Sequence, residues 1–558
     1  MGTAVTIPPH KLFLEFSREI GASNVISDAA SRVAAQTATF HTRQTIPLIL
    51  RPANREEVQA CVRIAKRGRL SLYTISSGKN WGYGSRVPVA DGCALLDLGR
   101  MNRIVDFHEE RAYVTVEPGV NQQDLHNFLR RRKSKLWMDA TGSSPECSLI
   151  GNAAERGFGH TPYGDHFNHV CGLEVVLANG DCIETGFGRF PNAVAAPLYR
   201  WGVGPYLDGL FSQSNFGIIT RMTIWLMPRP ESFQAFFFRC ETQEDFARVV
   251  DALRPLRLDG TLRSAVHIGN DYKVLAGMQN YPWEETQGQT PLSPVVMQRL
   301  RKQLNIGCWN GSGALYGSRN QVKEARRLLR RALSRKFAKL QFLDEKRLRM
   351  AGRFARGYRL ATGWDIRRTI ELARPIFGLL RGIPTSHSIS SAYWRKSAPA
   401  PKDMDPDRDR CGLLWAAPVL PIDGRLALAF AREISAIMLS HGFEPLISMT
   451  LLTERSLSCI ISITYDRDIP GEDQKAMGCY RAVMDKASER GYYSYRLGIQ
   501  SMDAGKGQGG YNRFVETLKR AIDPDGILAP GRYEPLHEAA ERAAERAAEP
   551  GVAKVRHR

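Results

Sequence analysis

The strongest constraint on the fold of this chain is a long segment rich in glycine and small polar residues and poor in aliphatic ones. It spans residues 151–166 and reads GNAAERGFGHTPYGDH. A plain surface loop of this length is uncommon in a compact domain. A segment that wraps around a large flat ligand would explain the composition, because glycines let the backbone approach a ligand closely. We therefore expect residues 151–166 to line a ligand site.

Two further segments have a similar composition. The first, SSGKNWGYG at 76–84, follows a strand predicted at 70–75, which itself follows a helix that begins after an Asn54 N-cap. Backbone N–H groups of such a loop can close on a diphosphate. The loop alone fits a plain turn equally well, because it matches neither G-x-G-x-x-G nor the P-loop pattern. The second segment lies at 204–217 and leads into a strand predicted at 221–226.

Length and composition predict a folded protein of two or more domains. The chain has 558 residues, of which 43% are hydrophobic and 24% charged, and it exceeds what one hydrophobic core usually supports. It contains no run of about 18 apolar residues, so we expect no membrane span. Its ten cysteines form no C-x-x-C pair and no zinc-type cluster with histidines. We therefore expect free thiols in a reducing cytoplasm and no metal site.

The formal net charge of +20 raises nucleic acid as a partner. Basic residues gather at 130–135 and at 326–339. Apolar residues recur at helical spacing through the second run, at Val322, Ala325, Leu329, Ala332, Leu333 and Phe337. This spacing predicts an amphipathic helix whose arginines form a solvated face. No aromatic RNA motif or zinc-finger spacing accompanies the charge. We expect no nucleic-acid partner, and a basic binding protein without catalysis stays as the alternative of another class.

The glycine-rich segments resemble the vanillyl-alcohol oxidase and 4-cresol methylhydroxylase family of flavoproteins. The likeness lies at 80–84, 116–120, 151–166, 204–217 and 526–531, within a match that extends from about 48 to 532. The resemblance implies an α+β fold, in which a two-part FAD-binding domain carries an inserted α/β cap domain.

The resemblance also implies the domain bounds, and Pro228 and Pro230 mark a break at the first of them. The first part of the FAD-binding domain would span 1–230 and the cap or substrate domain 231–490. The chain would return to the FAD-binding domain at 491–535 and end in a flexible tail at 536–558.

Cofactor-binding residues carry over by position, and the loop at 78–80 would hold the pyrophosphate of FAD. The implied set is Ser77, Gly78, Lys79, Asn80, Gly82, Gly142, Gly151, Asn152, Gly157, Ile219 and Arg532.

Catalytic residues carry over in the same way. In the family, residues matching Tyr83, Tyr495 and Arg496 bind the phenol oxygen. A free phenol has a pKa of about 10 and is mostly protonated at neutral pH, so a fixed guanidinium charge favours the phenolate. The tyrosine hydroxyls add hydrogen bonds to the oxyanion. The phenolate then drives hydride from the benzylic carbon to flavin N5, which leaves a p-quinone methide. His160 stands where the family often has tyrosine, and both an acid–base and a structural role fit it.

Two departures from the family pattern carry further predictions. The oxidase branch links FAD covalently through a histidine, but the aligned residue here is Ser458, and the assisting histidine aligns near Gln36. We therefore predict non-covalent FAD, with Cys459 and His41 as the alternative attachment points. The oxidase branch also has an aspartate beside flavin N5 that helps water add to the quinone methide.

No acid falls at that aspartate's position, although Asp139 and Glu146 flank it. Hydration would lack its base, which favours another fate for the quinone methide. We predict oxidative decarboxylation of a 4-hydroxyphenyl, tyrosine-derived carboxylic acid to a styryl product. Side-chain hydroxylation or desaturation of a 4-alkylphenol stays open, as does a flavoenzyme acting on a sugar or hydroxy acid. The electron acceptor, O2 or another, and a homodimer are also open.

Overall fold

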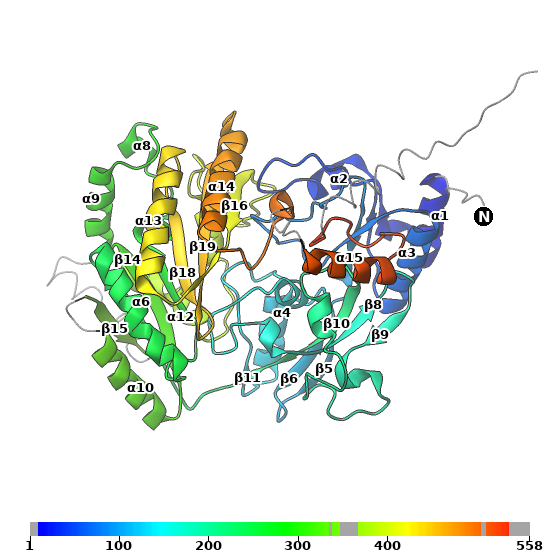
Figure 1. The fold of residues 1–558 in the computed structure, drawn as a ribbon, viewed down its shortest axis with the longest axis horizontal. Helices are drawn as coiled ribbons and strands as arrows, with labels where there is room; N and C mark the ends of the chain where they lie inside the picture. The colour runs from blue at the N-terminus through cyan, green and yellow to red at the C-terminus, as the bar shows by residue number, and fades with distance from the viewer. Residues whose placement is uncertain (1–8, 334–336, 346–365, 504–508, 535–558) are drawn as a thin grey trace, which may run out of the picture.

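The computed structural model describes residues 9–333, 337–345, 366–503 and 509–534 (Figure 1). Three larger β-sheets organise this part of the chain, with four, five and eight strands. The four- and five-stranded sheets and their helices form one half of the molecule, and the eight-stranded sheet and its helices form the other. The fold is α+β, as predicted.

The four-stranded sheet supports the first glycine-rich loop. In spatial order its strands are β1 (Val25–Ile26), β2 (Ile49–Leu50), β4 (Ala94–Asp97) and β3 (Leu72–Ile75). Helices α1 (Pro9–Ile20) and α3 (Arg55–Arg67) pack together beside it, and Asn54 caps α3 as predicted. Both β2 and β3 run parallel to β4. The loop at 76–84 therefore begins at the carboxyl end of a parallel strand, where α/β sheets bind ligands.

The five-stranded sheet is antiparallel throughout. Its strands, in spatial order, are β5 (Ile104–His108), β6 (Tyr113–Val116), β10 (Ile218–Trp225), β8 (Val170–Val176) and β9 (Cys182–Glu184). The hairpin of β8 and β9 turns at Gly180, whose φ of 84° suits glycine. Helix α4 (Gln122–Arg131) begins with a capping box at Asn121, and α5 (Leu149–Ala154) begins after a Ser148 cap. A small ribbon pairs β7 (Leu136–Trp137) with β11 (Met227–Pro228).

The eight-stranded sheet carries the largest apolar core on one face. Its strands in spatial order are β15 (Lys339–Leu343), β12 (Ser232–Cys240), β14 (Trp309–Gly317), β13 (Val266–Asn270), β18 (Leu446–Leu451), β19 (Ser456–Asp466) and β16 (Cys411–Ala416), with β17 (Val419–Pro421) also on β19. Helices α6 (Gln243–Leu258), α10 (Arg319–Ala332), α13 (Gly424–Ser440) and α14 (Glu472–Glu489) supply the rest of this core. Because side chains alternate along a strand, the other face is free to line a site. Elsewhere in this half lie α7 (Asp271–Met278), α8 (Trp283–Thr286), α9 (Pro294–Leu304) and α12 (Ile366–Leu379).

The end of the chain returns to the first half. Helix α15 (Gly510–Ile522) lies beside the N-terminal sheets (Figure 1). The Leu72 N–H donates to the Ile527 carbonyl at 2.7 Å, and the Ala529 N–H donates to the Leu72 carbonyl at 2.7 Å. The chain end is thereby bonded to β3, directly before the first glycine-rich loop. Within the described ranges, no helix is long and apolar enough to cross a membrane, and all ten cysteines are free thiols.

One predicted helix has different bounds in the structure. Of the basic run at 326–339, only 326–332 lie in a helix, which begins after a Ser318 capping box and ends at Ala332. Residue Phe337 therefore lies outside the helix, and β15 begins two residues later to pair with β12. The pairing of β15 with β12, rather than the helical spacing of the apolar residues, thus determines the structure after the helix. The predicted tail at 536–558 lies outside the described residues.

Candidate active site

A cavity of about 590 Å³ lies where the glycine-rich loops meet the open face of the eight-stranded sheet. It is lined by Tyr83, His160, Tyr495 and Arg496 of the predicted catalytic set, and by Ser77, Gly78, Lys79, Asn80, Gly142, Gly151, Asn152, Gly157, Ile219 and Arg532 of the predicted cofactor set. The predicted residue that does not line it is Gly82. Its φ is 78°, and an added Cβ would lie 3.0 Å from the Trp415 ring, so this glycine serves the turn and its packing.

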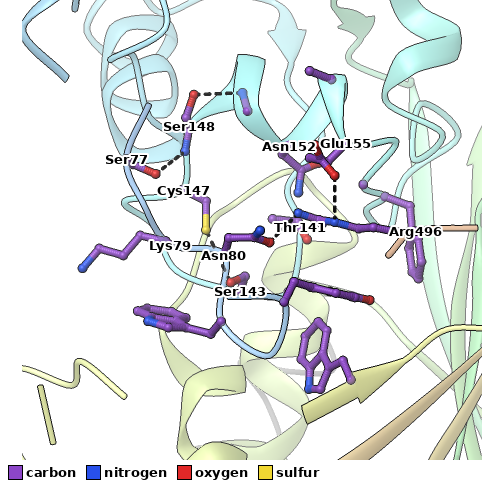
Figure 2. Close-up of a pocket in the computed structure, with 18 of the residues that line it drawn as sticks. Ser77, Lys79, Asn80, Thr141, Ser143, Cys147, Ser148, Asn152, Glu155 and Arg496 are labelled. Atoms are coloured by element: carbon purple, nitrogen blue, oxygen red, sulfur yellow. Dashed lines mark hydrogen bonds and ion pairs between the residues drawn. The ribbon is translucent and has the colours of Figure 1, made fainter. Parts of the chain in front are cut away.

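The first glycine-rich loop has the free donors that a diphosphate needs. Among the described residues, none accepts a hydrogen bond from the backbone N–H groups of 77–80. The Ser77 hydroxyl accepts from the Ser148 N–H at 3.1 Å, which holds the loop against the start of α5 (Figure 2). A Cβ on Gly151 would lie 2.5 Å from the Ser76 hydroxyl, so α5 can dock here only with glycine. Consecutive unpaired amides form an anion-binding concavity, and the loop fits the pyrophosphate of FAD.

The side chain of Lys79 is already paired within the chain. Its ammonium lies 3.0 Å from a Glu146 oxygen and 3.2 Å from an Asp405 oxygen. Burial disfavours the charged form, but the two carboxylates outweigh it and raise the pKa of Lys79. The backbone of this loop, rather than its lysine ammonium, is therefore the part suited to a phosphate.

Arg496 points into the cavity and joins the loop to the predicted phenol site (Figure 2). Its Nη2 donates to the Asn80 side-chain oxygen at 2.6 Å. Its guanidinium carbon lies 4.6 Å from the centre of the Tyr83 ring. The Tyr83 hydroxyl is buried and has no hydrogen-bond partner in the described part of the chain. Because a buried hydroxyl without a partner is costly, this orphaned group indicates a ligand.

Tyr495, which directly precedes Arg496 in the sequence, lines the same cavity. Its N–H donates to the Ala417 carbonyl at 3.1 Å, and its carbonyl accepts from the Gln213 side chain at 2.8 Å. Its ring centre lies 5.9 Å from that of Phe158. Burial raises the pKa of Tyr495, and Arg496 offsets part of that rise. The hydroxyl therefore stays protonated at neutral pH and can donate a hydrogen bond.

Glu155 is a site residue to which the sequence assigned no role. Its carboxylate pairs with Arg532, accepts from the Tyr533 hydroxyl at 2.9 Å, and lies 3.4 Å from Nε of Arg496. Burial raises the pKa of Glu155, but Arg532 and Arg496 outweigh it and hold the pKa below its usual value. The ionised carboxylate thus fixes both guanidinium groups. The only sequence feature that pointed to Glu155 was its position within the glycine-rich segment 151–166. Its role could not be predicted from that segment, because its partners are distant in the sequence.

His160 is held in one tautomer. Its Nδ1 lies 3.1 Å from the Ala140 carbonyl, which can only accept, so Nδ1 carries the proton and the neutral ring keeps Nε2 as an acceptor. Its N–H donates to both Asp139 oxygens at 3.0 Å. The ring stacks on His267 with centres 4.2 Å apart. Burial lowers the pKa of His160, although Asp139 opposes the shift. The arrangement offers an acceptor to the cavity rather than an acid.

The carboxylates that flank the family's aspartate position are both engaged elsewhere. Asp139 accepts from the N–H groups of His160 and Thr161 and lies 3.2 Å from His166 Nε2. Glu146 pairs with Lys79. Of the described residues that line the cavity, Glu155 alone is acidic. No carboxylate is therefore free to act as a base on water there.

The aligned flavin-attachment position does not line the cavity, although its neighbours Thr450 and Ile460 do. Ser458 and Cys459, in β19, are 5% and 0% exposed, and neither lines the cavity. His41 is exposed at the surface and does not line it either. Gln36 ends α2 (Ala29–Ala35), and its side-chain oxygen accepts from the Ile46 N–H at 2.8 Å.

Comparison with known proteins identifies related flavoproteins over most of the chain. Residues 46–186 match a protein family described as an FAD binding domain. The chain is 45% identical over 535 residues to the 1'-carboxy-chondrochloren decarboxylase of Chondromyces crocatus, covering 96% of this chain and 98% of that protein. It is 32% identical over 481 residues to the 4-cresol dehydrogenase [hydroxylating] flavoprotein subunit of Pseudomonas putida, covering 86% and 85%.

Solved structures agree with the sequence relatives. The fold matches p-cresol methylhydroxylase with substrate bound at a TM-score of 0.84 and 29% identity, covering 94% of this chain and 97% of that one. It also matches 4-ethylphenol oxidase from Gulosibacter chungangensis, in complex with isoeugenol. The TM-score is 0.84 and the identity 29%, and the match covers 96% of this chain and 99% of that one. The chain therefore belongs to the vanillyl-alcohol oxidase and 4-cresol methylhydroxylase family of FAD-dependent oxidoreductases.

Proposed function

We propose that this protein oxidises the side chain of a para-substituted phenol and ends the reaction by decarboxylating a 4-hydroxyphenyl carboxylic acid to a styryl product. The observation that carries the first step is the meeting of Tyr83, Tyr495 and Arg496 at one cavity. The decarboxylating step is supported by the absence of a free carboxylate base among the described lining residues. It is also supported by a relative that is named a decarboxylase.

The residues act on the ring oxygen of the substrate. The Arg496 guanidinium favours the phenolate, and the Tyr83 and Tyr495 hydroxyls donate hydrogen bonds to it. Asn80 and Glu155 orient the guanidinium from two sides. The loop at 77–80 would hold FAD, which would supply the acceptor for the hydride that leaves the benzylic carbon. Electron density from the phenolate weakens that C–H bond across the ring, and the substrate becomes a p-quinone methide.

Decarboxylation restores the aromatic ring without water. The bond from the carboxylate carbon to the adjacent carbon breaks, and its electron pair becomes part of the new vinyl double bond. The electrons of the quinone methide return to the ring oxygen, which becomes a phenolate again. The acid and FAD thus give a vinylphenol, CO2 and reduced FAD.

The products of 3-(4-hydroxyphenyl)propanoate test this function. We expect anaerobic bleaching of the flavin absorbance and a product lighter than the substrate by CO2 and two hydrogens, measured by mass spectrometry. Gain of an oxygen atom would instead show side-chain hydroxylation, and loss of two hydrogens alone would show desaturation. Either result would contradict the decarboxylating step. A 4-alkylphenol without a carboxylate is the matched substrate, and its flavin bleaching tests the hydride step alone.

We further propose that FAD is bound without a covalent link. The support is that neither Ser458 nor its alternatives Cys459 and His41 lines the cavity. Precipitation of the purified protein with acid or heat should release yellow flavin into the supernatant, measured by its absorbance. Flavin that stays with the washed, denatured pellet would contradict the proposal.

We propose that the FAD-binding domain comprises residues 1–230 and 491–535 and that 231–490 form the cap. Support comes from the backbone bonds between Leu72 and the 527–529 segment, which join the chain end to the first half. The eight-stranded sheet is built entirely from strands between Ser232 and Asp466.

A further inference from the structure

A lysine in the cap wall of the cavity has no acidic partner. Lys273 lies in α7, lines the cavity, and donates from Nζ to the Ser462 hydroxyl at 3.2 Å. No carboxylate of the described chain lies within ion-pair distance of it. Lys79, which lines the same cavity, contacts two carboxylates. Burial without such a partner lowers the pKa of Lys273 to about 8. Its ammonium is therefore a desolvated cation that an anionic ligand would stabilise.

Much of the surrounding wall is polar, in contrast to the opposite face of the same sheet, although Val274, Met278 and Ile460 also line the cavity. Alternating positions of β13, β14 and β18 send polar side chains to the cavity, namely His267, Asn310, Ser312, Ser448 and Thr450. Their neighbours Ile268, Ile447 and Met449 belong to the apolar core behind the sheet. A pocket for a hydrocarbon side chain would be expected to bury apolar groups. This wall suits a substrate whose side chain carries polar atoms.

Lys273 is also connected to the phenol site through a short chain of contacts. Its partner Ser462 pairs in register with Trp415, across β19 and β16. Directly opposed residues of an antiparallel pair point to the same face, with Cβ atoms about 5 Å apart. The Trp415 ring lies 5.8 Å from the Tyr83 ring, edge to face. Lys273, Trp415 and Tyr83 therefore line the same cavity, and Trp415 is a neighbour of both Tyr83 and the Ser462 partner of Lys273.

We propose that Lys273 binds the carboxylate of the substrate's side chain and so selects phenolic acids over neutral alkylphenols. This inference rests on the proposed function and names a second anchoring point for its substrate. Arg496 meets the ring oxygen and Lys273 meets the carboxylate, so the two ends of a doubly anionic substrate each meet a cation. Once CO2 has left, the product carries a neutral vinyl group, which cannot form an ion pair with the ammonium. The contact therefore strengthens substrate binding and not product binding.

The substitution Lys273→Met tests this role, with 3-(4-hydroxyphenyl)propanoate and 4-propylphenol as substrates of equal ring and chain length. The readout is the ratio of kcat/KM for the acid to kcat/KM for the alkylphenol, measured on FAD-loaded protein. We expect the ratio to fall about 10- to 100-fold, because a hydrogen bond between charged groups is lost. The loss should appear mainly in KM for the acid, since the contact belongs to the bound substrate.

Three further variants separate charge from structure. Lys273→Arg keeps the cation and should retain a ratio well above that of Lys273→Met. Ser462→Asp gives the ammonium an internal carboxylate and should also lower the ratio, which provides a test if Lys273→Met does not fold. Lys302→Met, at an exposed lysine of α9, should leave the ratio at its wild-type value.

The outcomes distinguish this inference from the proposed function. Wild-type ratios in both Lys273→Met and Ser462→Asp would overturn the role of Lys273 and leave the proposed function intact. Equal losses in Lys273→Met and Lys273→Arg would overturn it as well. If the wild-type protein bleaches its flavin with neither phenol, the proposed function itself fails.

Discussion

Replacing Arg496 by glutamine should lower kcat/KM for any phenolic substrate by about 10³-fold, because it removes the charge that favours the ring phenolate. The guanidinium lies against the Tyr83 ring and is fixed by Asn80 and Glu155. Glutamine keeps a donor of similar reach but no charge. The rate of anaerobic flavin bleaching, followed by stopped flow, reports the hydride step directly.

The exposed Arg513 in α15 provides the matched control for Arg496→Gln. Arg513→Gln removes the same charge from a surface position and should bleach its flavin at the wild-type rate. The substrate should be tested at raised pH too, where more of the free phenol is ionised. Part of the lost rate should then return to Arg496→Gln, because the missing charge is needed mainly to ionise the ring oxygen. A wild-type bleaching rate in Arg496→Gln would refute the mechanism.

Replacing Glu155 by glutamine should destabilise the protein by about 3 kcal/mol, because it leaves two largely buried guanidinium groups without their shared carboxylate. Arg496 and Arg532 have side chains 12% and 15% exposed, and both pair with Glu155. The same change frees Arg496 to move, so the flavin bleaching rate should also fall. Denaturant unfolding and stopped flow measure the two effects separately.

A surface pair supplies the comparison for Glu155→Gln. Glu324 and Arg327 form an exposed pair within α10, with side chains 54% and 61% exposed. Glu324→Gln should leave the free energy of unfolding close to its wild-type value, since exposed pairs contribute little. If Glu155→Gln were as stable and as active as Glu324→Gln, Glu155 would have no part in holding the arginines.

The sequence predicted the parts of the site that depend on local composition. Tyr83 and Arg496 are more than 400 positions apart, yet the family resemblance placed both at one cavity because each lies in a recognisable segment. Gly82 shared its segment with true lining residues, and only the three-dimensional packing shows that it faces Trp415 instead. Local composition thus identifies a loop, but not which of its residues face the ligand.

Residues whose role depends on distant partners could not be predicted in this way. Glu155 lies within a recognised segment, but its role depends on ion pairs with Arg496 and Arg532, which come from the end of the chain. Lys273 carries no local signal, because one lysine in an amphipathic helix is ordinarily solvated. Its significance comes from the absence of an acidic neighbour in the described structure, and a sequence pattern does not record that absence.

The backbone bonds between Leu72 and the 527–529 segment also bear on how the protein is made. Strand β3 and its loop emerge early from the ribosome, whereas the segment that joins them and the Arg532 side chain emerge near the end of translation. Domains generally fold in order of synthesis, N-terminal first, but residues from both ends of the chain line this cavity. We therefore expect FAD to load after translation, and a nascent chain that stalls within the cap should remain colourless.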